Sequence, residues 1–151
     1  LGTLQQPQEA FKSFDQAVKI QPNDAIAWLN RGLALGALKQ YEEAISSFEK
    51  TLEILPESHK AWNAKGEMLV ALERDKEALE SFDRAIKIQP KYPNAYYNKA
   101  ICYALQGRVK LAMDNLELAI AINPKLREQA RNDADFDALV ESERFWQLIE
   151  A

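Results

Sequence analysis

The chain has 151 residues, of which 47% are hydrophobic and 28% are charged, and its formal net charge is -4. This composition suits one ordinary hydrophobic core and excludes an intrinsically disordered chain. Residues 1–126 carry 16 basic and 16 acidic side chains, whereas residues 127–151 carry 3 basic and 7 acidic ones. Because a nucleic-acid binder needs an excess of basic groups to displace counterions from phosphates, we expect no nucleic-acid partner.

Three further features bear on where the protein resides. The longest apolar stretch, Leu33 to Leu38, is far too short to span a membrane, so we expect no membrane span. Cys102 is the single cysteine and cannot form an internal disulfide, which makes the cytoplasm the default location. The sequence begins at Leu1 without a signal-peptide pattern, and we expect it to be part of a longer protein.

The dominant pattern is a repeat of apolar and small residues every 34 positions. The repeated positions form the series Trp28, Trp62, Tyr96; Leu1, Leu35, Leu69, Tyr103; Gly32, Gly66, Ala100; Ala10, Ala44, Ala78, Ala112; Phe14, Phe48, Phe82, Leu116; Ala17, Thr51, Ala85, Ala119; and Pro22, Pro56, Pro90, Pro124. An unbroken register of this kind indicates a chain built from one supersecondary unit.

In chain order, residues 1–24 are expected to be the second half of a unit, followed by complete units at 25–58, 59–92 and 93–126. Apolar spacing of i, i+3, i+4, i+7 predicts two helices in each complete unit. In the first of these units, the helices are predicted at 25–38 and 41–54. The two-residue break between them is short enough to require an antiparallel hairpin.

The motifs W-L-N-R-G-L-A-L at 28–35 and Y-E-E-A-I-S-S-F-E-K-T-L-E-I-L-P at 41–56 resemble the tetratricopeptide repeat (TPR). The resemblance extends over about 126 of the 151 residues. It implies an all-α fold, a right-handed superhelix of antiparallel helix hairpins (a TPR solenoid), with partner peptides bound in its concave groove. Thr51, Asp75, Ala100 and Leu116 depart from the family pattern, and each departure can be absorbed by local repacking.

Residues 127–151 break the repeat but keep apolar residues at helical spacing, and we interpret them as a C-terminal helical cap that covers the end of the array. Asp135 and Ser142 are the expected N-caps of two short helices in this segment. The segment also resembles the acidic D-x-D-F-D stretches that follow repeat arrays in bacterial members of the family.

The sequence predicts no enzyme, no cofactor and no metal site, because it contains no nucleophile, P-loop or zinc motif. The single histidine, His59, is expected at a solvated helix start, and Cys102 is expected to be a buried thiol. The aspartates at 133, 135 and 137 imitate the start of a calcium loop. Ala138 and Arg144 then occupy the positions that require Gly and Glu, which excludes that loop.

The candidate binding residues lie on the face of each unit's first helix that points away from the hairpin. We predict a peptide-binding groove formed by Leu29, Asn30, Leu33, Lys60, Asn63, Glu67, Asn94, Tyr97, Asn98 and Ile101. The large apolar members suggest a groove for apolar side chains, and the asparagines supply amides for a peptide backbone.

Two alternatives concern this groove. Leu29 and Leu33 could instead pack on the first helix of the neighbouring unit. Some members of the family hold a C-terminal carboxylate with a clamp of two Lys, two Asn and one Arg. Asn30 and Lys60 fit that clamp, but Ala64 stands in place of its Arg, so we do not assign this ligand.

The sequence therefore favours a protein-protein interaction module, a scaffold or an adaptor, that binds a protein or peptide. One alternative is a regulatory or substrate-recruiting part of a larger enzyme that lies upstream of Leu1. Self-association of the chain is also possible.

Overall fold

The computed structural model describes residues 2–151, with their side chains from Gln5 onward. Leu1, which the sequence places in one of the apolar series, lies outside the described residues. All regular elements in the described part of the chain are helices, which confirms the predicted all-α fold of stacked hairpins. The chain divides into two compact units, one ending at Arg84 and the other covering Ala85–Ala151.

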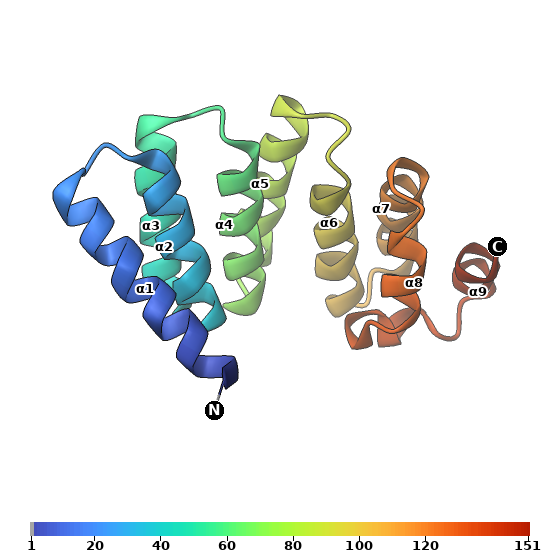
Figure 1. The fold of residues 1–151 in the computed structure, drawn as a ribbon. Coiled ribbons are helices and arrows are strands. Elements are labelled where there is room, and N and C mark those ends of the chain that lie inside the picture. Colours follow the sequence, from blue (N-terminus) through green and yellow to red (C-terminus); the bar gives the residue numbers. More distant parts are fainter. Residues whose placement is uncertain (1) are drawn as a thin grey trace. The chain divides into compact units, whose positions relative to one another are not determined.

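The first unit contains hairpins of antiparallel helices joined by short connections (Figure 1). Its helices are α1 (Gly2–Ile20), α2 (Ala25–Ala37), α3 (Tyr41–Ile54), α4 (His59–Ala71) and the first part of α5 (Asp75–Ile88). Asp24 and Ser58 begin α2 and α4, because their side-chain oxygens accept bonds from the amides of Ala27 and Ala61 at 3.1 and 3.2 Å.

Each hairpin turns at a residue with left-handed backbone geometry. The φ angles are 61° at Lys39, 59° at Glu73 and 74° at Gly107. In the first turn the amide of Gln40 donates to the carbonyl of Leu35 at 2.9 Å, which satisfies a free carbonyl at the end of α2. Glycine adopts this geometry without strain, so Lys39 and Glu73 hold it at a small energetic cost.

The two helices of a hairpin touch at a small residue. A Cβ atom added at Gly32 would lie 2.4 Å from the Phe48 ring, and one added at Gly66 would lie 2.4 Å from the Phe82 ring. In the second unit the equivalent pair is Ala100 and Leu116, both fully buried. The two departures from the repeat pattern are therefore complementary. Ala100 is larger than the glycine it replaces, and Leu116 is smaller than the phenylalanine it replaces.

An aromatic residue near the start of the first helix of each repeat unit donates a hydrogen bond to the connection that precedes that helix. The indole Nε1 of Trp28 donates to the carbonyl of Pro22 at 2.7 Å, and that of Trp62 donates to Pro56 at 3.1 Å. In the second unit the Tyr96 hydroxyl donates to Pro90 at 3.3 Å. This bond explains why the position tolerates Trp or Tyr, the two aromatic residues that carry a donor.

The second unit contains the end of α5 and the remaining helices (Figure 1). These are α6 (Pro93–Leu105), α7 (Val109–Ile122), α8 (Leu126–Arg131), the 3-10 helix η1 (Ala134–Leu139) and α9 (Glu143–Glu150). The tail thus has three short helices rather than the expected two. Phe136 and Leu139 of η1 and Phe145 and Ile149 of α9 are at most 2% exposed in one core with α6 and α7.

The N-caps in the tail differ from those expected. Asp133, not Asp135, begins η1, and its carboxylate accepts a bond from the amide of Asp135 at 3.0 Å. Ser142 does precede α9 but makes no capping bond through its side chain. Asp133 and Asp135 are two residues apart and are equally good capping residues, so the sequence alone could not choose between them.

Candidate peptide-binding surface

The predicted groove residues fall into four positions of the repeat, counted from the first residue of a unit at 25, 59 or 93. Position 5 holds Leu29, Asn63 and Tyr97; position 2 holds Lys60 and Asn94; position 6 holds Asn30 and Asn98; and position 9 holds Leu33, Glu67 and Ile101. In the structure these positions differ in how much of each side chain is exposed to solvent.

Position 5 faces neighbouring helices rather than solvent. Tyr97 is only 3% exposed: its ring packs edge-on against Phe136 at 5.3 Å, and its hydroxyl donates to a carboxylate oxygen of Asp133 at 2.8 Å. Burial, reinforced by the negative charge of Asp133, raises the pKa of this hydroxyl. The expectation that Tyr97 is open to a peptide is therefore wrong, because η1 covers it.

The other two residues at position 5 are also covered. Asn63 is 4% exposed, and its amide donates to Glu67 at 3.2 Å. Leu29 is half-buried and packs against the cluster that contains Phe48 and Ala64. That cluster combines residues of the hairpin of Leu29 itself with Ala64 of α4, so packing of Leu29 on the neighbouring unit's helix stays a prediction.

Positions 2 and 9 are open in the first unit. Leu33 is 49% exposed, and Ile26, at position 2 of the same helix face, is 67% exposed. Since these two residues are seven apart on α2, they lie on one face of the helix, with the half-buried Asn30 between them. On α4, Lys60 and Glu67 are exposed at the same two positions.

We call Ile26, Asn30, Leu33, Lys60 and Glu67 the α2–α4 surface. One side of it is apolar and the other carries one charge of each sign. Ala64, which stands where the carboxylate clamp needs arginine, is 6% exposed, so the clamp is incomplete in the structure as well.

In the second unit the same face is more polar and more covered. Asn94 is exposed and Asn98 is half-buried. Ile101 is half-buried and packs against the core formed with the tail. Leu105, at the end of α6, is 56% exposed and was not among the sequence candidates.

The comparisons agree with this architecture. Family models described as tetratricopeptide repeat match residues 25–58 and 93–126, and a third, described as TPR repeat, matches residues 66–107. A solved structure described as PilW, a widely conserved type IV pilus biogenesis factor, is 30% identical over 97% of this chain and 72% of its own, with a TM-score of 0.76. The chain belongs to the tetratricopeptide-repeat family.

Two structures of MamA show the same TPR fold at lower identity. A MamA protein is 20% identical over 96% of this chain and 78% of its own, with a TM-score of 0.75. MamA from Desulfovibrio magneticus RS-1 is 22% identical over 95% and 84%, with a TM-score of 0.72. None of the curated proteins compared with the chain matches it.

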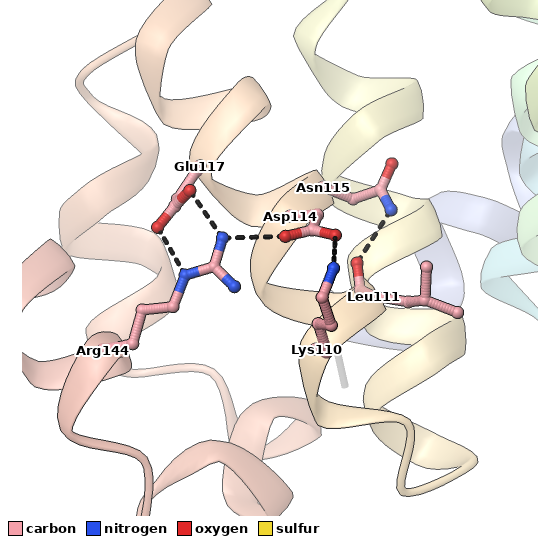
Figure 2. Close-up of polar contacts among 6 residues, drawn as sticks. All are labelled: Lys110, Leu111, Asp114, Asn115, Glu117 and Arg144. Atoms are coloured by element: carbon pink, nitrogen blue, oxygen red, sulfur yellow. Dashed lines mark hydrogen bonds and ion pairs between the residues drawn. The ribbon is translucent and has the colours of Figure 1, made fainter.

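Polar contacts join the tail of this TPR chain to α7 (Figure 2). Arg144 of α9 donates to both carboxylate oxygens of Glu117 at 2.7 and 2.8 Å and to Asp114 at 2.8 Å. Lys110 adds a bond to the other oxygen of Asp114 at 3.2 Å. These bonds hold the pKa of each carboxyl below its usual value and raise that of Arg144.

The single cysteine and the single histidine lie on helices of the TPR units. Cys102 is buried in α6, and its sulfur accepts a bond from Gln106 at 3.4 Å. His59 begins α4, where burial and the nearby Lys60 lower its pKa. Within residues 2–151 no group of three His, Cys, Asp or Glu side chains is arranged to hold a metal ion. No helix in that range is long and apolar enough to cross a membrane.

Proposed function

We propose that this TPR chain is a scaffold or adaptor that binds a protein or peptide partner through the α2–α4 surface. The observation that supports the proposal is the exposure of two large aliphatic side chains, Ile26 and Leu33, on one face of α2. Neither fills the hairpin core, and a monomer that exposes apolar side chains beside polar ones commonly does so at an interaction site.

The side chains of this surface indicate which kind of segment a partner would present to it. Its apolar side suits a segment with two aliphatic or aromatic side chains, and the Asn30 amide can bond to a peptide carbonyl or amide. Lys60 and Glu67 on α4 favour a segment that carries both an acidic and a basic group. On α6, Asn94, Asn98 and Ile101 remain candidates for a second contact region in the other unit.

The test is a capture of partners from a lysate followed by mass spectrometry, with Leu33→Glu compared with the unchanged chain. Leu118 on α7 is 48% exposed, and Leu118→Glu is therefore a matched control with the same chemical change. We expect Leu33→Glu to remove a partner that the control retains. Equal capture by both variants would refute the proposal.

Two further proposals accompany this function. Residues 127–151 act as a C-terminal cap, which is supported by the four buried apolar side chains that η1 and α9 add to the core of the second unit. A cytoplasmic location, which the single cysteine suggests, remains a prediction that fractionation of the natural host would test.

A further inference from the structure

The α2–α3 and α4–α5 hairpins carry a tryptophan, a basic residue and a serine at equivalent positions, but the basic residue differs. In the first hairpin it is Arg31, whose guanidinium lies 5.5 Å from the centre of the Trp28 ring. Its Nη1 donates to the Ser47 hydroxyl at 2.7 Å, and its Nε donates to Asp15 at 3.0 Å. One planar group with several donors thus joins an indole, a serine and a carboxylate.

In the second hairpin the equivalent residues are Trp62, Lys65, Ser81 and Glu49. The Lys65 ammonium is a compact charge rather than a planar fork, and it pairs with Glu49 at 3.4 Å. Ser81 is only 3% exposed, and within residues 2–151 its hydroxyl has no hydrogen-bond partner. Lysine in place of arginine therefore leaves a buried polar group unpaired, which is costly unless another molecule pairs with it.

A cavity of about 170 Å³ opens beside this serine, between α4 and α5. The half-buried Trp62 and the buried Leu69 and Ser81 line it, and the exposed side chains of Glu80 and Arg84 lie at its rim. The Arg84 guanidinium lies 5.4 Å from the centre of the Trp62 ring. The cavity thus offers an indole ring and a serine hydroxyl, which are two of the groups that Arg31 contacts in the first hairpin.

The charges around the cavity favour a cation. The charged side chains that line it, together with their ion-pair partners, are Lys65, Arg74, Arg84, Glu42, Glu49, Glu77 and Glu80. Three of these are positive and four are negative, so the set carries one net negative charge. Glu80 stands where the first hairpin has Ser46, and among the described residues it has no ion-pair partner. Its carboxylate is therefore available to an incoming cation.

We propose that this cavity binds a guanidinium group, presented by an arginine of a partner polypeptide or by free arginine. The group stacks on Trp62, donates to Ser81 and pairs with Glu80, and so makes the kinds of contact that Arg31 makes in the first hairpin. At about 100° per residue, Trp62 and Lys65 lie on the opposite side of α4 from Lys60 and Glu67 of the α2–α4 surface. The site is therefore separate from that surface.

The indole N–H resonances of the chain's three tryptophans provide the assay. In an NMR titration with N-acetylarginine methylamide, we expect the Trp62 signal to shift saturably, with a dissociation constant on the order of 1 mM. The Trp28 signal should stay in place, because Arg31 already lies over that ring. N-acetyllysine methylamide has the same charge without the planar donors, and it should bind at least about threefold more weakly.

A third titration, with free arginine, identifies the source of the group. Tighter binding of the blocked arginine would assign the site to an arginine within a polypeptide. Tighter binding of free arginine would assign it to the amino acid. Each result supports a guanidinium site.

Variants of the chain locate the binding. Lys65→Arg gives the second hairpin the residue of the first, so the chain's own guanidinium should fill the cavity and lower the affinity at least about tenfold. Lys65→Met is the matched control: it also removes the lysine but adds no guanidinium, and it should not lower the affinity. Ser81→Ala removes one acceptor and should weaken binding about threefold, whereas Arg84→Ala removes a like charge and should tighten it. Circular dichroism checks that each variant is folded.

Three results would overturn the proposal. The first is equal binding of the arginine and lysine probes, because a planar donor would then not be recognised. The second is undiminished binding of the arginine probe to folded Lys65→Arg. The third is a Trp62 shift caused by acetate at lower concentration than by the arginine probe, and lost in Arg84→Ala, because the cavity would then be a site for anions.

Discussion

Replacing Gly32 with alanine places a methyl group where the Phe48 ring lies. The added Cβ would be 2.4, 2.7 and 2.9 Å from three ring carbons, so the ring or the helix must move. Overpacking of this kind costs about 1–3 kcal/mol, while alanine gains about 1 kcal/mol of helix propensity over glycine. Because the ring is fully buried and cannot swing outward, we expect the upper part of that range and a net loss of about 1–2 kcal/mol.

The equivalent pair in the second unit, Ala100 and Leu116, suggests a compensating change: Phe48→Leu combined with Gly32→Ala in a double variant. Phe48→Leu alone leaves a cavity and should cost about 1–2 kcal/mol. In the double variant, the added methyl group occupies part of the space that the ring vacated. We therefore expect the double variant to be more stable than the sum of the single effects by at least about 1 kcal/mol. Urea denaturation followed by circular dichroism measures all four proteins, and strictly additive effects would refute the packing argument.

Three other predictions follow from individual contacts. Lys39→Gly should raise stability by about 0.5–1 kcal/mol, because it relieves a φ of 61°, and an unchanged or lower urea midpoint would contradict this. Tyr97→Phe keeps the ring but loses the bond to the carboxylate of Asp133, the N-cap of η1, and should cost about 1–2 kcal/mol in thermal or urea unfolding, without altering the fold in circular dichroism. Arg144→Gln should lower stability at neutral pH. Since Asp114 and Glu117 have pKa values below their unfolded values of 3.8 and 4.5, their contribution is present above those values and is lost as pH falls through the lower folded ones, so the difference between variant and unchanged chain should disappear in acid.

The hairpins could be predicted from the sequence because their determinants are local. Gly32 and Phe48 recur as Gly66 and Phe82 in an unbroken register, and a break of two residues permits only an antiparallel pair. The left-handed turns were not predicted, because Lys39 and Glu73 are not residues that signal such geometry.

The candidate surface was predicted less well because it depends on how neighbouring helices are rotated about their axes. Leu29 and Leu33 lie one turn apart, and periodicity places both outside the hairpin core. The packing of the helices decides that Leu29 is half-buried against the core while Leu33 stays 49% exposed. Likewise, Tyr97 looks like an exposed aromatic until the tail is placed over it, and the 34-residue pattern does not describe the tail.

The hydrogen bonds from the tryptophan indoles make the junctions between helix pairs separately observable. The chain has three tryptophans, and each donates to a carbonyl six residues earlier: Trp28 to Pro22, Trp62 to Pro56 and Trp146 to Val140. Exchange of each indole proton with deuterium therefore reports the opening of one particular connection. A chain that unravels from one end would lose these protons in sequence order, whereas a chain that opens as a whole would lose all three at one rate.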